Sequence, residues 1–220
     1  MIEKGISFGG LHSFRDFNLI LSGVKIPPAS PRENYVDIPG ANGSVDLTEA
    51  FGEVKYQDRT GVTFTFYMNP AGDLSENAWE AKKTEISNRL NGLRCNIVLD
   101  ADPDYFWSGR CKVNELSFNK KLRKIVVGAR LAPYKAKINE TRVTVSLTKS
   151  TQEVTLTNAR KKVCPTIICT GGATLTVAGA EYVLSEGTHK LLDFQLSEGE
   201  TTVSVSGTGT MTFVYQECDL

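Results

Sequence analysis

The chain has 220 residues and carries 25 Lys and Arg against 25 Asp and Glu, so its formal net charge is zero. This balance argues against a protein that wraps nucleic acid or binds a membrane surface, because both depend on an excess of cations. No run approaches the roughly 18 to 20 apolar residues that span a bilayer. The N-terminus shows no apolar signal-peptide segment. We therefore expect a folded protein with no nucleic-acid recognition, no membrane insertion and no signal peptide.

The first 135 residues combine strand patterns with one helix pattern. Residues 62–68 alternate apolar and polar side chains with the period of a half-buried strand. A helix is predicted over about 74–91, where Asp73 can cap the first turn and Glu76 can complete a capping box. Gly92 follows as a C-terminal stop. The apolar positions that share one face of this helix are Trp79, Ile86, Leu90 and Leu93.

A long β-hairpin is predicted over about 110–131. Residues 111–118 and 125–131 both alternate, and a polar break at 119–121 separates them. The cluster of Lys120, Lys121, Arg123 and Lys124 at this break is interpreted as a solvated tip rather than a nucleic-acid patch, because no aromatic residue interleaves it. A sheet with one packed helix predicts an α+β domain over residues 1–135.

The composition changes after residue 135. Residues 136–220 are rich in Thr, Ser, Val and Gly, and short alternating runs follow one another between glycines. Many short strands at close spacing are typical of a β-sandwich. The sequence therefore predicts a mainly β protein with two domains, 1–135 and 136–220, the second a β-sandwich.

The sequence contains no recognisable catalytic, cofactor or metal motif. Asp100, Asp102 and Asp104 have the spacing that opens a calcium loop, but Tyr105 and Cys111 stand where that loop needs Gly and Glu, so a polar turn is expected. The two histidines, His12 and His189, are interpreted as surface or turn residues. Free thiols are expected for the five cysteines, which are Cys95, Cys111, Cys164, Cys169 and Cys218.

The N-terminal part contains GISFGG at residues 5–10 and P-G-x-x-G-x-x-D-L-T at 39–48, followed in order by Tyr56, Arg59, the strand at 63–68 and the Trp79 helix. These features give it a resemblance to the distal tail (Dit) proteins of long-tailed bacteriophages. YFWSGR at 105–110, PYK at 133–135 and the segment 207–220 continue it. Cys218 stands near the chain end, where the family has a glycine.

The most specific part of this motif has a structural interpretation. Pro39 fixes φ and Gly40 accepts a positive φ, so the pair sets a tight turn, and Gly43 repeats that freedom. Asp46 and Thr48 can hydrogen-bond the local backbone and hold the loop. We expect these five residues to form a structural loop.

The resemblance implies a structural virion protein without enzymatic activity or cofactor. Such a hub forms a hexameric ring of N-terminal β-sandwich domains, each with a helix and a long hairpin, and carries C-terminal galectin-like or carbohydrate-module-like sandwiches. It joins the tail tube protein to the tail-tip lysin, fibre or receptor-binding protein. The implied location is the virion tail tip, after assembly in the bacterial cytoplasm. The residues nominated for contact between subunits are Arg110, Val113, Phe118, Lys120, Lys121 and Val127.

Two other functions stay open at this stage. The C-terminal sandwich could be a carbohydrate-binding module or adhesin that recognises a cell-wall saccharide, although its only aromatics are Tyr182, Phe194, Phe213 and Tyr215. A cell-wall hydrolase is a weaker alternative, since it would depend on His12 or His189.

Overall fold

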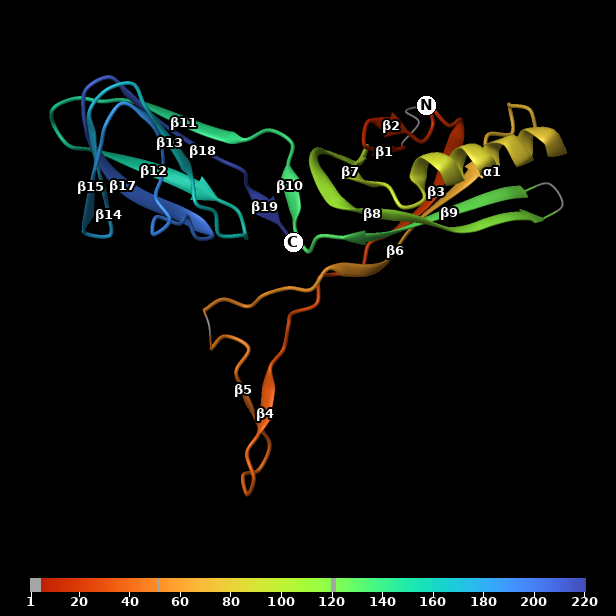
Figure 1. The fold of residues 1–220 in the computed structure, drawn as a ribbon, viewed down its shortest axis with the longest axis horizontal. Helices are drawn as coiled ribbons and strands as arrows, with labels where there is room; N and C mark the ends of the chain where they lie inside the picture. Colours follow the sequence, from red (N-terminus) through yellow and green to blue (C-terminus); the bar gives the residue numbers. More distant parts are fainter. Residues whose placement is uncertain (1–4, 51, 120–121) are drawn as a thin grey trace. The chain divides into compact units, whose positions relative to one another are not determined.

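The computed structural model describes residues 5–50, 52–119 and 122–220 and divides into two compact units. One unit ends at Lys135 and the other runs from Ala136 to Leu220. Both are built from antiparallel β-sheets, and the described residues contain a single α-helix (Figure 1). The predicted mainly β class is confirmed. Within the described ranges, no helix is long and apolar enough to cross a membrane.

The first unit is organised around one antiparallel sheet with the strand order β2-β1-β7-β8-β9-β6-β3. Alternate side chains of β6 are buried, as the period-two pattern of 62–68 predicts. Phe8, Phe64 and Phe66 pack edge to face in the core, with ring centroids 5.7 and 6.2 Å apart. The strands are β1 (Ile6–Phe8), β2 (Leu11–His12), β3 (Leu19–Lys25), β6 (Arg59–Met68), β7 (Arg94–Leu99), β8 (Asp102–Asn119) and β9 (Leu122–Leu131).

Helix α1 (Glu76–Leu90) covers this core with the apolar face that the sequence predicts. Trp79, Ile86 and Leu90 are buried. The N-cap is Ser75, whose Oγ accepts a hydrogen bond from Ala78 N (3.2 Å), so the prediction that Asp73 caps the helix is wrong. Asp73 instead accepts from the backbone N of Ser75 (2.8 Å) and orients the capping residue.

The hairpin is longer than its sequence pattern indicates. β8 already begins at Asp102, directly after a two-residue turn from β7. β9 is paired on both sides, with β8 and with β6, whereas the pairing of β8 with β7 ends at Arg110 and its pairing with β9 continues to Asn119. Near the tip, Arg123 donates to Leu74 O and stacks on Phe118 at 4.8 Å, which ties the hairpin to the start of α1. Lys120 and Lys121 lie outside the described residues.

The second unit is a β-sandwich of two four-stranded antiparallel sheets around a common core. One sheet has the order β11-β18-β13-β16 and the other β12-β17-β14-β15. Phe194 and Phe213 pack edge to face between them at 6.3 Å, and Leu156, Ile167 and Leu175 are fully buried. The strands are β11 (Thr141–Ser146), β12 (Gln152–Asn158), β13 (Thr166–Cys169), β14 (Ala173–Val177), β15 (Ala180–Leu184), β16 (Gly187–Lys190), β17 (Gly199–Gly207) and β18 (Thr210–Tyr215). The short strands β10 (Lys135–Lys137) and β19 (Cys218–Asp219) belong to neither of these two sheets and pair with each other.

His12 is a buried structural residue, so its interpretation as a surface or turn histidine is wrong. Its Nε2 lies 3.0 Å from Asp100 Oδ2, and its Nδ1 accepts hydrogen bonds from the backbone N atoms of Phe14 and Arg15. Asp100 Oδ2 also accepts from Gly5 N (2.8 Å). The pair therefore joins the N-terminal strands to the turn between β7 and β8.

Asp100 is expected to make stability depend on pH below its ordinary pKa. Burial alone would raise the pKa of Asp100, but the hydrogen bonds from His12 and Gly5 outweigh it and hold the pKa below 3.8. A lowered pKa contributes stability above the unfolded value, and this contribution is lost as pH falls through the folded value. Asp100→Asn keeps an acceptor but not the charge. Denaturant unfolding between about pH 6 and about pH 3 should show the gap between wild type and variant narrowing with acid. A constant gap would contradict this.

Candidate functional site

An exposed two-stranded arm leaves the first unit between β3 and β6. The arm, defined as residues 33–54, carries β4 (Tyr35–Asp37) and β5 (Ser44–Asp46), which among the described strands pair only with each other (Figure 1, orange). Every residue of both strands is exposed. An isolated two-stranded ribbon is marginal in water. The two strands of the arm therefore bury little apolar surface of their own.

The five residues of the predicted structural loop all lie in this arm. Gly40 and Gly43, in the turn between the two strands, have φ values of 84° and 78°, and Pro39 precedes them. Asp46 Oδ1 accepts from Thr48 N (2.9 Å), and Thr48 Oγ1 accepts from the backbone N of Asn34 (3.0 Å). These contacts fix the turn and the return strand.

The arm has one apolar and one acidic face. Pairing of Val36 with Val45 sets the alternation, which places Ile38 and Leu47 on the same side, and these four side chains are 37–50% exposed. The opposite face carries Tyr35, Asp37, Ser44 and Asp46. Residues 33–54 contain no Lys or Arg and five carboxylates, which are Glu33, Asp37, Asp46, Glu49 and Glu53.

Negative charge is concentrated around Tyr35. Glu33, Tyr35, Asp46 and Glu49 line a shallow depression of about 360 Å³ on the arm. The charges of Asp46 and Glu33 raise the pKa of Tyr35, because they oppose formation of a phenolate. Hydrogen bonds from Thr48 hold the pKa of Asp46 below its ordinary value, so this carboxylate stays charged at neutral pH. The polar face of the arm is thus an anionic surface.

Arg59 holds the base of the arm. Its side chain is buried; Nη1 donates to Pro27 O (2.6 Å) and Nε to Pro133 O (3.0 Å). Its guanidinium also lies 4.6 Å from the centroid of the Trp107 ring. Arg59 therefore connects the segment that enters the arm to the sheet and to the loop that follows β9.

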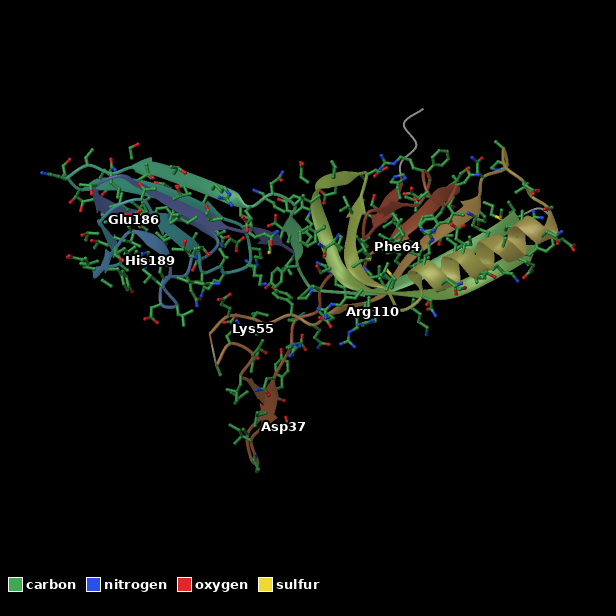
Figure 2. All side chains as sticks on the ribbon, turned by 45° about the horizontal axis from the view of Figure 1, so that its top comes forward. Asp37, Lys55, Phe64, Arg110, Glu186 and His189 are labelled. Atoms are coloured by element: carbon green, nitrogen blue, oxygen red, sulfur yellow. The ribbon has the colours of Figure 1, made fainter. Side chains whose placement is uncertain are left out.

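Three arginines lie side by side across the outer face of the sheet. Arg94 on β7 is directly opposite Arg110 on β8, and Arg110 is directly opposite Arg130 on β9. This arginine row is exposed, and Lys112, two residues beyond Arg110, adds a fourth cation (Figure 2 labels Arg110). Like charges directly opposite one another destabilise a sheet. Binding of an anionic partner would therefore relieve the electrostatic repulsion between the arginines of the row.

Local contacts relieve the repulsion within the row only in part. Arg110 Nη1 donates to Gly92 O (2.6 Å), and Arg130 Nε pairs with Asp58 Oδ2 (2.9 Å). The row borders a hollow of about 770 Å³, in which Asp58 is the one carboxylate among the described lining residues. Within the hollow the Asn114 side chain packs on Gly128, where an added Cβ would lie 2.3 Å from the Asn114 amide nitrogen.

The nominated hairpin residues have different environments. Arg110 belongs to the arginine row, Phe118 is 48% exposed near the tip, and Val113 is half-buried against the core. Val127 is fully buried in the core, so its side chain is not available to a neighbouring subunit, and that nomination is corrected. Lys120 and Lys121, the remaining two, are outside the described part of the chain.

The other candidate groups have structural partners. Asp100 binds His12, and Asp102 pairs with Lys135 Nζ (2.7 Å), so neither is a free ligand of a calcium loop. His189 lies on β16 rather than in a turn, and its Nε2 lies 2.8 Å from Ser185 O.

All five cysteines are free thiols. Cys95 and Cys111 are hydrogen-bonded to each other, which, together with burial, raises the pKa of Cys111. In the described residues, no three His, Cys, Asp or Glu side chains group as metal ligands.

The architecture of the chain is that of a phage hub protein of known structure. That structure is the crystal structure of SPP1 Dit (gp 19.1), described as a paradigm of the hub adsorption apparatus in phages that infect Gram-positive bacteria. The two share 15% sequence identity with a TM-score of 0.70, and the likeness covers 99% of each chain. The predicted Dit-like fold is confirmed. No family model matches the sequence, and no curated protein matches it.

Proposed function

We propose that this protein is a structural component of a phage tail, a distal tail hub of the Dit type. The observation that carries the proposal is that the likeness to SPP1 Dit extends over both units and 99% of the chain. The motif at residues 39–48 supports it, because it builds an exposed arm rather than a pocket for a reaction. In this role the protein acts through its surfaces and has no catalytic activity or cofactor.

The finer proposal is a hexameric ring that joins the tail tube to the tail-tip apparatus. The partners would be five further copies, the tail tube protein above, and a tail-tip lysin, fibre or receptor-binding protein below, at the virion tail tip. Closed rings need a heterologous contact, in which one surface meets a different surface of the next copy. The arm and the outer edge of β8 beyond Cys111 are unlike surfaces of this kind. Arg110, Val113 and Phe118 are the described hairpin residues that we assign to the contact, with Lys120 and Lys121 beyond them.

A carbohydrate-binding role for the second unit is less well supported. Saccharide-binding sandwiches commonly stack sugar rings on exposed aromatic side chains. Phe194, Phe213 and Tyr215 are at most 3% exposed, and Tyr182 packs on the core. Residues 136–220 therefore lack an aromatic platform among these side chains, and we propose that the unit serves as a docking or spacing module with a galectin-like outline.

The ring predicts a native mass of about 145 kDa, six times the 24.1 kDa of one chain. Light scattering coupled to size exclusion would measure it, and negative-stain electron microscopy should show rings with a central hole. A protein that stays at 24.1 kDa at high concentration, both alone and with the tail tube protein, would contradict the hexamer.

A further inference from the structure

We propose that the acidic face of the arm of one copy docks on the arginine row of the next copy. The inference deepens the proposed ring and rests on it, because it names the two surfaces that would meet between neighbours. The arm and the row are both exposed and both belong to the first unit. They are different surfaces, as a heterologous contact requires.

The charges of the two surfaces are complementary. Residues 33–54 carry five carboxylates and no cation, and the hollow carries four cations against the one carboxylate of Asp58. Asp58 is already paired with Arg130, so the hollow keeps a positive surplus. Complementary surfaces of this kind steer association and fix its register.

Each surface also carries unfavourable repulsion when it is left without a partner. Arg94, Arg110 and Arg130 are directly opposite one another, which costs free energy in the sheet. On the arm, the negative field around Tyr35 raises its pKa, which shows that Glu33 and Asp46 repel further negative charge. Contact between the two would relieve both repulsions at once.

The two surfaces are also compatible in shape. The arm is a narrow ribbon of two short strands, and the hollow of about 770 Å³ is lined in part by small residues such as Gly61 and Ala129. Seating the acidic face there leaves Val36, Ile38, Val45 and Leu47 turned outward, where they can meet a further surface of the neighbour. A second copy is the occupant that this chain itself supplies in equal amount.

Charge inversion tests the contact. Arg94→Glu with Arg110→Glu reverses two charges of the row, and Glu33→Lys with Glu49→Lys reverses two of the five charges of the arm without touching the hydrogen bonds of Asp46, Thr48 and Ser44. Each double variant is expected to weaken self-association at least about tenfold in light-scattering titrations. The chain that carries all four substitutions should regain part of it, because the reversed side chains again meet opposite charges across the contact. Glu140→Lys with Arg142→Glu, an exposed pair in the second unit, is the matched control and should leave association unchanged.

Cross-linking identifies which copies meet. Carbodiimide joins Lys112 to a nearby carboxylate, and a mixture of heavy-nitrogen-labelled and unlabelled chains separates links between copies from links within one. Mixed-label links from Lys112 to Glu33 or Glu49 are expected. Links found only within a chain would mean that the arm covers its own row, and they would overturn the proposal. The proposal would also be overturned if an added polyanion covered the row and a second copy of the chain did not.

The outcomes separate this inference from the proposed function. If rings form and neither double variant weakens them, the arm contact is wrong and the hub stands. If the wild-type protein never forms rings, with or without its tail tube partner, both the hexamer and this contact between copies are wrong.

Discussion

Truncation of Phe64 to alanine is expected to lower the free energy of unfolding by roughly 3–5 kcal/mol. Phe64, labelled in Figure 2, is fully buried at the centre of β6 and packs edge-on against Phe8 at 5.7 Å. Its removal loses the transfer free energy of the ring and leaves a cavity that β6 cannot close, because β6 is paired on both sides, with β3 and with β9. Denaturant unfolding followed by tryptophan fluorescence measures the change.

Leu122→Ala is the control for this result. Leu122 is 59% exposed on β9 of the same sheet, and exposed substitutions change stability by about 0.5 kcal/mol or less. A loss below about 1.5 kcal/mol for Phe64→Ala would mean that the ring is not part of a closed core. Equal losses for the two variants would contradict the assignment of the inner and outer faces of the sheet.

Replacement of Arg59 by methionine is expected to cost roughly 2–4 kcal/mol and to release the base of the arm. The carbonyls of Pro27 and Pro133 would lose their donors, and the contact with the Trp107 ring would be lost. Methionine keeps an unbranched stem but lacks the guanidinium, so the loss reports the removal of that group with its hydrogen bonds, its charge and its ring contact. Thermal unfolding gives the stability, and hydrogen exchange of residues 26–33 gives the mobility of the entering segment.

Arg59→Lys separates charge from geometry. An ammonium group can replace one of the two donors but lacks the planar fork that reaches both carbonyls, so an intermediate loss is expected. Arg142→Met, on an exposed strand of the second unit, should change stability by no more than about 0.5 kcal/mol. If the methionine variant is as stable as wild type and its hydrogen exchange is unchanged, the interpretation that Arg59 holds the base of the arm is wrong.

Elements whose apolar residues recur with a regular period could be predicted from sequence, but the residues at which they begin and end could not. The spacing of Trp79, Ile86 and Leu90 located α1, because a helix that buries one face must repeat its apolar residues. Its first residue depended on whether Asp73 or Ser75 capped it, and both are good capping residues. The start of β8 at Asp102 was hidden for a similar reason, since Asp and Pro in that segment favour a turn.

The candidate docking surfaces could be predicted only in part. The motif at Pro39–Gly40 and Gly43 identified the turn of the arm, but its strands are three residues each, too short for a periodic signal. Arg94, Arg110 and Arg130 are far apart in the sequence, and only the register of β7, β8 and β9 brings them into one row. That register includes a bulge between Val113 and Glu115. A register shift of one residue moves every side chain of a strand to the opposite face of the sheet, so the row cannot be derived from composition.

The position of the arm between β3 and β6 also determines how the sequence of such a protein can evolve. The two strands are neighbours in the sheet and are held in register at Lys25 and Thr63, so the ladder fixes both ends of the insertion. Lengthening a connection costs little, about 0.6 kcal/mol for each doubling of its length. The arm can therefore gain, lose or exchange residues while the sheet keeps its core. A lineage could alter the length and the charge of the arm without refolding the sheet that carries it.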